Sequence, residues 1–461
     1  MNLPDDLLFS HRLQRSRILL FLLSGVLLIV GIGNPTVVRT QEARVLETAR
    51  QMLNQPVEKW LIPELNGDVR LQKPPLPYWY TALGFMAFGE NEFAGRLPTA
   101  VMAWVTLLMT YLAASLLFDP RIGVLSSAML LGSYLFARHS RLAETDLPAT
   151  LFTTIAVLSV IRAMKDRNSL ADLHVFALSV GLVIVTKGGP AVFSMLFLIA
   201  LVLIEKRWDL LKRFFLSGAI VTLLVVALPW FVYAIVHHGL DTFLRELRNT
   251  AEGGDHANSG LEYIAVLAWG AAPWSVALPF AIYQASKRWR TDWRLRVCLL
   301  WIACIAIPLL LNGNKQKHYL LPLLPAVMIL VAWWIACCWK QFKLAAIVAF
   351  VLAIILPLTV TLVVPRLILN PSRTVAQRLR QNYGDTDLRF YGENYSPVLS
   401  FNLRKRIPIV EGDDAVASLP PEATLLIIGK QGRPIVAPPL PFALLEQFDE
   451  AGQTYALYRR R

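Results

Sequence analysis

Long apolar runs separated by short polar stretches make up the chain as far as Val364. Many of these runs are about 17–25 residues long, the length that an α-helix needs to cross a bilayer. The pattern predicts about eleven membrane-spanning helices, within a range of about 11–13. The predicted spans are residues 18–33, 96–118, 121–137, 147–164, 172–186, 189–205, 213–236, 261–285, 295–311, 318–339 and 344–364.

Two apolar stretches need separate interpretation. The first span follows a basic segment, as the apolar part of a signal peptide would. No small-residue cleavage site follows it, so we expect a retained span. The run Leu76–Phe88 is too short to cross comfortably and is expected to form a juxtamembrane or re-entrant helix.

The sequence after Val364 has the character of a soluble domain. We therefore expect a transmembrane domain over residues 1–364 and a small soluble α/β domain over residues 365–461. The predicted fold class is a mainly α-helical polytopic membrane protein with a small C-terminal α/β domain outside the membrane. The expected strands of that domain are Leu388–Tyr391, Thr424–Ile428 and Tyr455–Tyr458, and the expected helix is Arg373–Gln381.

The composition agrees with a membrane protein and decides how the net charge is interpreted. Of the 461 residues, 55% are hydrophobic and 17% are charged, and the net charge is +13. In a soluble protein such a charge would suggest a nucleic-acid partner. Here the basic residues cluster in short loops between the spans, for instance at Lys206, Arg207 and Lys212. Membrane topology and anionic lipids explain such loops, so no nucleic acid is expected as a partner.

The charged loops also predict the orientation in the membrane. With the N-terminus in the cytoplasm, the inner loops are short and rich in Lys and Arg, as the positive-inside rule requires. The first outer loop is then 34–95, a second outer loop is 237–262, and the C-terminal domain is extracytoplasmic. The polar motifs of interest all fall on this outer face.

The first outer loop opens on an amphipathic helix, expected over residues 40–54 and lying on the membrane interface. Gln41, Glu42 and Arg44 lie at its start. Glu42 is a candidate catalytic acid, although an acid in the first turn also simply complements the helix dipole. Further along, Lys73 precedes two prolines that stiffen the backbone. It is a candidate contact for a phosphate at headgroup depth, with ordinary snorkelling as the alternative.

A second acidic candidate, Asp146, lies where the fourth predicted span begins. A carboxylate at that position can cap the helix, so a structural role is the alternative. Arg138, His139 and Arg141 are close by in sequence, and ionisable residues at a membrane edge often mark a substrate path. Asp146 is therefore a candidate catalytic residue and Arg141 a candidate substrate contact.

The outer loop 237–262 is polar and long enough to act as a lid. Its His256, beside Asp255, suits a base, a phosphate ligand or a surface pair. Neither this histidine nor the four cysteines have the spacing of metal ligands, so zinc is not expected. No cofactor is predicted, and the need for a divalent metal stays open.

Further cations lie at the outer ends of two predicted spans. Lysines on the outer side go against the charge rule, so we expect them to bind an anion, for which phosphate is the economical candidate. Lys187 is one such residue. The candidate substrate contacts before the tenth predicted span are Lys315, Lys317, His318 and Tyr319.

Several short stretches occur together and in order: Glu42-Ala43-Arg44 through Glu47, Leu65-Asn66-Gly67, Lys73-Pro74-Pro75, Glu92–Pro98, Thr145-Asp146, Lys187-Gly188, Gly254-Asp255-His256 and Lys317-His318-Tyr319. In these stretches the chain resembles the bacterial lipid A aminoarabinose transferase family and its protein O-mannosyltransferase relatives. These are polytopic GT-C glycosyltransferases that use polyprenyl-phosphate sugars. The resemblance spans residues 18–330 and implies a GT-C-like fold, without singling out one substrate.

One position departs from the family pattern. The family carries Asp-Glu in the first loop, with the Asp regarded as catalytically important, and here Gln41 replaces that Asp. Gln cannot act as a general base or carry negative charge. Either Glu42 or Asp146 takes the role, or the acceptor needs no base, or the chain is catalytically weak. Because Glu42 points about 100° away from Gln41 on a helix, Asp146 is the preferred carboxylate.

The resemblance implies a membrane glycosyltransferase on the outer face of a bacterial inner membrane. It would move a hexose or pentose from a polyprenyl-phosphate donor to a lipid A-like lipid, a glycan or a protein. One alternative is a lipid or sugar transporter, which would carry charged residues deep within its spans. The other is a non-catalytic family member that serves as an assembly or binding subunit, as Gln41 suggests. The sequence does not name the sugar, the acceptor or the oligomeric state.

Overall fold

The computed structural model divides the chain into two compact units. The helical unit comprises Met1–Ile32, Leu71–Pro77 and Arg96–Val364, and the mixed unit comprises Gly33–Arg70, Tyr78–Gly95 and Pro365–Arg461. Much of the first outer loop therefore forms one compact unit with the C-terminal domain. The structure describes residues 3–34, 36–71, 73–166, 169–252, 260–311, 316–339, 341–364, 371–392, 395–432, 435–439, 441–450 and 452–460.

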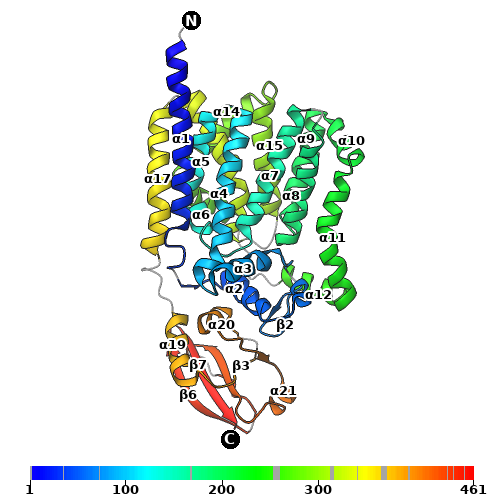
Figure 1. The fold of residues 1–461 in the computed structure, drawn as a ribbon, viewed down its shortest axis with the longest axis vertical. Coiled ribbons are helices and arrows are strands. Elements are labelled where there is room, and N and C mark those ends of the chain that lie inside the picture. Colours follow the sequence, from blue (N-terminus) through cyan, green and yellow to red (C-terminus); the bar gives the residue numbers. More distant parts are fainter. Residues whose placement is uncertain are drawn as a thin grey trace. The chain divides into compact units, whose positions relative to one another are not determined.

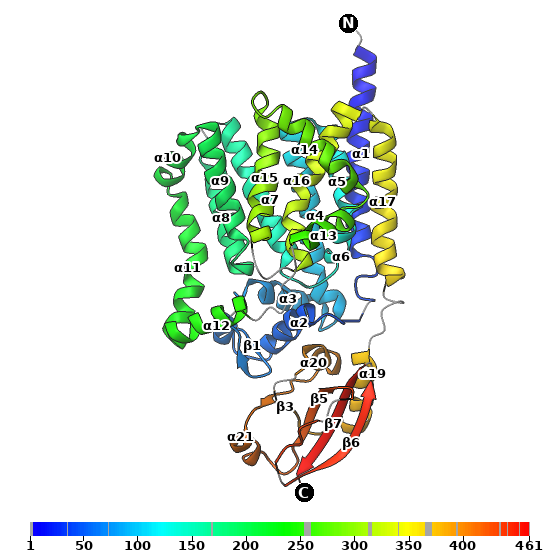
Figure 2. The same cartoon turned by 180° about the vertical axis from the view of Figure 1, so that it is seen from behind.

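Long helices lie side by side in the helical unit (Figures 1 and 2). This confirms the predicted mainly helical, polytopic fold. Among the described residues, six helices are long and apolar enough to cross a bilayer, or seven if one bent pair counts as a single span. The predicted number of about eleven spans, which includes shorter apolar helices, stays a prediction. The helices are α1 (Leu3–Ile29), α4 (Glu92–Leu117), α5 (Pro120–Leu131), α6 (Tyr134–His139), α7 (Asp146–Lys165), α8 (Ala171–Lys187), α9 (Ala191–Glu205), α10 (Trp208–Leu216), α11 (Ala219–His238), α12 (Leu240–Glu252), α13 (Gly260–Gly270), η2 (Trp274–Ala277), α14 (Leu278–Lys287), α15 (Trp293–Leu311), η3 (Lys317–Leu323), α16 (Leu324–Trp334), η4 (Ile335–Trp339) and α17 (Phe342–Leu362).

Three predicted spans are interrupted, among them 213–236, which begins in α10 and continues in α11. The expected span 121–137 is split into α5 and α6 at Gly132, where a Cβ atom would lie 3.0 Å from the backbone nitrogen of Ala353 in α17. The expected span 261–285 is bent by 116° between α13 and the following helical segment. Pro273 lies in that break, and a proline cannot donate the backbone hydrogen bond that would continue the helix.

Helices α7 and α8 form a closely packed pair joined by a short connection. An ion pair links them at each end. Lys187, the last residue of α8, bonds to Asp146, the first residue of α7. At the opposite end, Arg162 Nε lies 2.8 Å from a carboxylate oxygen of Asp172. The pair therefore holds Asp146 and Lys187 together at one end of the helical unit.

The mixed unit contains a five-stranded sheet in the order β4-β3-β5-β7-β6. β3 is parallel to β4 and β5, and β7 is antiparallel to β5 and β6. Helices α19 and α20 supply buried residues to the core on one face, and α21 does so on the other. The elements of this domain are α19 (Pro371–Tyr383), β3 (Leu388–Tyr391), α20 (Pro397–Leu403), β4 (Ile409–Val410), α21 (Asp413–Ala417), β5 (Thr424–Lys430), β6 (Phe442–Glu450) and β7 (Gln453–Arg460).

The predicted α/β domain is confirmed, with the three expected strands at β3, β5 and β7 and the expected helix at α19. The sequence missed β4, β6, α20 and α21. The longest of these, β6, pairs with β7 and has a register irregularity between Leu444 and Glu446. Such an irregularity interrupts the alternation of apolar and polar residues from which a strand is predicted.

The rest of the mixed unit comes from the first outer loop. The juxtamembrane helix is present as α3 (Leu76–Phe88) and the amphipathic helix as α2 (Thr40–Leu53). Short elements follow α2: η1 (Val57–Leu61), β1 (Glu64–Leu65) and β2 (Asp68–Val69).

The expectation that α2 lies on a membrane interface stays a prediction. Two of its charged residues, Glu47 and Arg50, are buried inside the protein. The helix packs against β1 and α20. On another side, a Cβ atom at Gly95 would lie only 2.2 Å from a terminal methyl of Leu46, so a larger residue would force that side chain to move.

Candidate functional site

Asp146 and Lys187 form the centre of the candidate site. Helix α8 ends at Lys187 because Gly188 takes a positive φ of 76°, a conformation that favours glycine and terminates helices. The side chain of Lys187 then reaches Asp146 at the start of α7, and both side chains are less than a tenth exposed. A buried ion pair at the edge of a membrane domain is expensive unless further contacts satisfy it.

Two aromatic side chains supply those contacts. Lys187 Nζ bonds to Oδ1 of Asp146, and His318 Nε2 lies 3.5 Å from Oδ2. The ammonium also lies over the ring of Tyr319, 4.1 Å from the ring centre, where a cation is attracted to the π-face. His318 and Tyr319 belong to η3, so this short helix places two predicted residues at Asp146.

A second polar pair lies behind His318. His139 Nδ1 is 2.9 Å from a carboxylate oxygen of Glu144, and both side chains are buried. The rings of His139 and His318 have their centres 5.7 Å apart. The His139–Glu144 pair therefore packs beside His318 through the contact between the two rings.

A cavity of about 240 Å³ opens beside the ion pair. Two lysines, Lys73 and Lys187, contribute to its wall together with Asp146 and Tyr319. The remaining wall is apolar, so the cavity combines two cations with a hydrophobic surface. This combination suits the anionic head of a lipid-linked molecule. The apolar and small residues of the wall are Ala149, Gly189, Pro190, Val192, Phe193, Pro308, Leu309 and Pro322.

The geometry limits what Asp146 can do chemically. One of its oxygens is bound by Lys187, and the other lies close to His318. A carboxylate so engaged is better suited to hold cations in place than to take a proton. The lysines can stabilise negative charge that develops on a departing group inside the cavity.

Other candidate residues of the helical unit lie elsewhere. The guanidinium of Arg141 is buried and donates to carbonyls at the end of α1, at 2.6 Å to Leu27 and also to Val30. This geometry favours anchoring of α1 over substrate contact. Lys317 is exposed at the start of η3. Within the expected lid 237–262, residues 240–252 form helix α12 rather than a loop. His256 and Lys315 lie outside the described residues.

The candidates of the first loop belong to the mixed unit. In α2, Gln41 and Arg44 are exposed and Glu42 is buried. Gln41 and Glu42 therefore face different surroundings, as expected for neighbours on a helix. Within the described residues, no group of three or more His, Cys, Asp or Glu side chains is placed to hold a metal ion.

Comparison with known proteins shows which proteins this chain resembles. The sequence model of the family described as dolichyl-phosphate-mannose-protein mannosyltransferase matches residues 72–233, a segment that holds Lys73, Asp146 and Lys187. An undecaprenyl phosphate-alpha-4-amino-4-deoxy-L-arabinose arabinosyl transferase of Pseudomonas fluorescens is 28% identical over 59% of this chain and 49% of its own length. One from Pseudomonas aeruginosa is 29% identical over 68% of this chain and 58% of its own. The chain thus spans between 49% and 58% of the length of these two relatives.

Solved structures agree over almost the whole chain. ArnT from Cupriavidus metallidurans in the apo state matches with a TM-score of 0.78 at 16% identity, covering 95% of this chain and 97% of ArnT. ArnT bound to undecaprenyl phosphate matches with a TM-score of 0.76 at the same coverage. At such identity the likeness shows the fold. In sequence the chain is similar to undecaprenyl phosphate aminoarabinose transferases and, over residues 72–233, to the protein mannosyltransferase family. Its fold is that of a multi-pass membrane protein similar to ArnT.

The sequence marked Lys187 as an unusual outer cation but did not pair it with Asp146. The two residues are 41 positions apart, and only the packing of α7 against α8 joins them. The apolar wall from Phe193, Pro308 and Leu309 has no sequence signal that separates it from the rest of the spans.

Proposed function

We propose that this protein is a membrane glycosyltransferase that moves a sugar from a polyprenyl-phosphate donor to a lipid A-like acceptor. The observation that carries the proposal is the cavity lined by Lys73, Lys187 and Asp146 together with apolar residues. The names of the relatives, undecaprenyl phosphate aminoarabinose transferases, support this donor class. An aminopentose is accordingly the sugar that we favour over a hexose.

In the proposed reaction the phosphate of the donor lies between Lys73 and Lys187. The acceptor oxygen attacks the anomeric carbon from the side opposite the phosphate, which gives inversion. As the bond from the anomeric carbon to the phosphate oxygen breaks, its electron pair leaves with the lipid phosphate. The two ammonium groups stabilise this charge, and such preorganised contacts are often the largest catalytic contribution.

The acceptor is best matched by a group that is already ionised, such as a phosphate of a lipid A-like molecule. A hydroxyl acceptor needs a base within hydrogen-bond reach of its proton. Asp146 is engaged by Lys187, and the first loop carries Gln41, which cannot take a proton. A phosphate acceptor brings its own negative oxygen and removes the need for that base.

The active face is proposed to be the outer face of the inner membrane, with the N-terminus in the cytoplasm. Loops rich in Lys and Arg, such as that with Lys206 and Arg207, are then cytoplasmic. A reporter that is active only in the cytoplasm should be silent when fused after Arg461 and active when fused within residues 206–212. An active reporter at the C-terminus would contradict this orientation.

Lys73→Ala is expected to weaken use of the donor while leaving the fold intact, because the residue supplies one cation to the cavity. Loss of one charge-assisted contact costs on the order of 1.5–3 kcal/mol, which is roughly a 10- to 150-fold loss in kcat/KM for the donor. Steady-state transfer at limiting polyprenyl-phosphate sugar measures this. Lys59→Ala, an exposed lysine of the same loop, is the control. Unchanged kcat/KM for Lys73→Ala would remove this residue from the donor site.

Two other functions would give different results in the same assay. A transporter would move lipid-linked sugar across a vesicle membrane without forming a glycosidic bond. Gln41 suggests the alternative hypothesis of a non-catalytic subunit. Such a subunit would bind the donor and give no product. Purified protein incubated with a polyprenyl-phosphate aminopentose and lipid A should yield glycosylated lipid A by mass spectrometry. Loss of that species from the lipids of a deletion strain would support the same assignment in the cell.

A further inference from the structure

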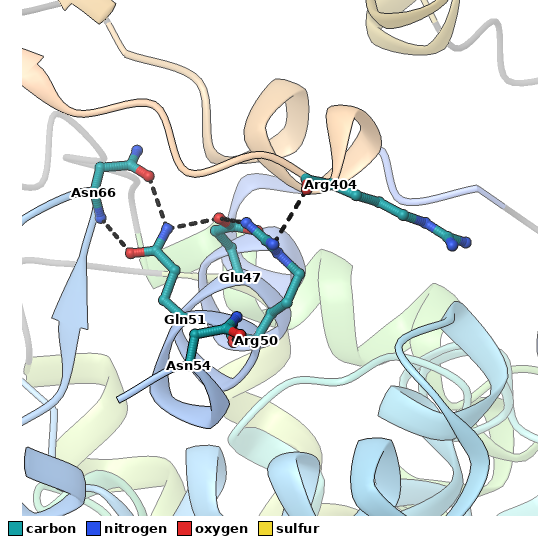
Figure 3. Close-up of polar contacts among 6 residues, drawn as sticks. All are labelled: Glu47, Arg50, Gln51, Asn54, Asn66 and Arg404. Carbon is teal, nitrogen blue, oxygen red and sulfur yellow. Dashed lines mark hydrogen bonds and ion pairs between the residues drawn. The ribbon is translucent and has the colours of Figure 1, made fainter. Parts of the chain in front are cut away.

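The mixed unit holds a buried network of charged and amide side chains that the proposed reaction does not use (Figure 3). Its centre is Glu47 of α2, whose side chain is fully buried. Arg50, one turn further along α2, donates to both of its oxygens, at 2.9 Å from Nε and 2.6 Å from Nη2. Gln51 Nε2 donates a third hydrogen bond of 2.6 Å. Each of these three hydrogen bonds is donated to Glu47, so its carboxyl oxygens act as acceptors.

The Glu47–Arg50 pair is tightly coupled. Burial lowers the pKa of the Arg50 guanidinium, but the hydrogen bonds and the charge of Glu47 outweigh burial and raise it. A bidentate guanidinium–carboxylate pair also fixes the orientation of both side chains. The Glu47 and Arg50 side chains are therefore held in one fixed arrangement on α2.

The network reaches a second element through Gln51. Its amide makes a reciprocal pair with Asn66, accepting from the backbone nitrogen at 2.8 Å and donating to the side-chain oxygen at 2.9 Å. Asn66 has a positive φ of 57° and Gly67 one of 106°, the left-handed conformations of the tight turn between β1 and β2. Gln51 thus fixes the hairpin against α2, which gives the Leu65-Asn66-Gly67 motif a structural role.

A third element is reached through Arg50. Its Nη1 donates to the carbonyl of Arg404 at 3.3 Å. Arg404 ends α20 in the left-handed conformation, so this bond satisfies a carbonyl at the helix terminus. Figure 3 shows the guanidinium placed between Glu47 and this carbonyl. Arg50 therefore joins the first outer loop to the C-terminal domain, across 354 positions of sequence.

We propose that Arg50 and Glu47 are positioning residues that hold the first turn of α2, with Gln41 and Glu42, in a fixed place relative to the C-terminal domain. The C-terminal domain then serves the reaction as the support of α2 rather than as a separate binding module. This inference rests on the proposed glycosyl transfer. Small displacements of supporting elements are costly, because a shift of about 1 Å can lower a rate by roughly 100-fold.

The test compares Arg50→Gln, Glu47→Gln and Arg50→Lys with a matched control. The control is Arg380→Gln. Arg380 lies in α19, and its exposed guanidinium donates to the carbonyl of Asn402 in α20. The control therefore removes a guanidinium bond to α20 that does not involve α2. We expect Arg50→Gln to lower kcat by roughly tenfold or more while the KM for the donor stays within about twofold. Arg50→Lys should recover part of kcat, and Arg380→Gln should leave it unchanged. Each kcat is normalised to the fraction of folded protein. A variant that only lowers the amount of folded protein therefore leaves the normalised kcat unchanged.

Hydrogen exchange supplies a readout that does not depend on transfer. Arg50→Gln and Glu47→Gln should speed exchange both in residues 397–403 and in residues 64–69, while β5 and β7 stay protected. If exchange rises and normalised kcat does not change, the network is structural and the proposal is wrong. Unchanged exchange at both segments would also overturn it. If the wild-type protein transfers no sugar, the proposed function fails, and the exchange result still decides whether the network joins the two segments.

Discussion

Replacing Asp146 by Asn is expected to lower the rate of glycosyl transfer by roughly 100-fold or more. Asn keeps the size of the side chain but removes the anion that holds Lys187, whose ammonium is buried at the cavity. Preorganised charges of this kind contribute about 10²–10³ to a rate. A general base would contribute about 10²–10⁴, so the size of the loss does not by itself separate the two roles.

Comparing two kinds of acceptor distinguishes these two roles of Asp146. If Asp146 holds the cations, the Asn variant should lose the same factor with a phosphate-bearing acceptor and with a hydroxyl acceptor. If it is a base, the loss should be much larger with the hydroxyl acceptor. The matched control is Asp172→Asn, which removes the carboxylate at the other end of the α7–α8 pair. Near-normal transfer by Asp146→Asn would show that the reaction does not need this carboxylate.

Lys187→Met is expected to abolish most transfer and also to destabilise the protein. The substitution removes a cation from the cavity and leaves Asp146 buried without its ammonium partner. Removing one partner of a buried ion pair costs about 3–5 kcal/mol. We expect the lower end of this range, because His318 remains beside the carboxylate. Thermal unfolding in detergent and steady-state transfer measure the two effects.

The double variant Asp146→Asn/Lys187→Met distinguishes stability from catalysis. Neutralising the stranded carboxylate should restore most of the lost stability, because no unpaired charge remains. Transfer should not return, since the cation that stabilises the leaving phosphate is still missing. A double variant that regains both would mean that Lys187 acts only as a structural partner of Asp146.

Hydrophobic pattern was sufficient to predict most of the long helices and the strands β3, β5 and β7, because a run of apolar or alternating residues is a local property of the sequence. Helix α3 has the predicted bounds, Leu76–Phe88, and strand β3 the predicted bounds, Leu388–Tyr391. Interruptions were harder to predict. The break at Gly132 depends on the close approach of α17, which lies about two hundred positions further along the chain.

The site could be predicted only as a set of polar residues, because the sequence does not show which of them meet. The same limit applies at α2. Charged residues of an amphipathic helix, such as Glu47 and Arg50, ordinarily meet water. In the fold α2 packs against α20, and Arg50 finds a partner in a carbonyl. Arg141 is comparable, since its partners are the carbonyls of α1. Neither type of partner has a side-chain signature that a sequence could reveal.

The bond between Lys187 and Asp146 has a consequence for the release of product. In the proposed reaction a donor phosphate that binds Lys187 replaces the carboxylate of Asp146 as the partner of the ammonium. The gain in binding free energy is therefore only the difference between two charge-assisted contacts. After the sugar has been transferred, the carboxylate of Asp146 can bind the Lys187 ammonium again as the lipid phosphate leaves. In the proposed reaction Lys187 therefore has an anionic partner at every stage. The lipid phosphate product is not retained by an unpaired ammonium group. Since product release limits many well-evolved enzymes, this return of the carboxylate favours repeated turnover.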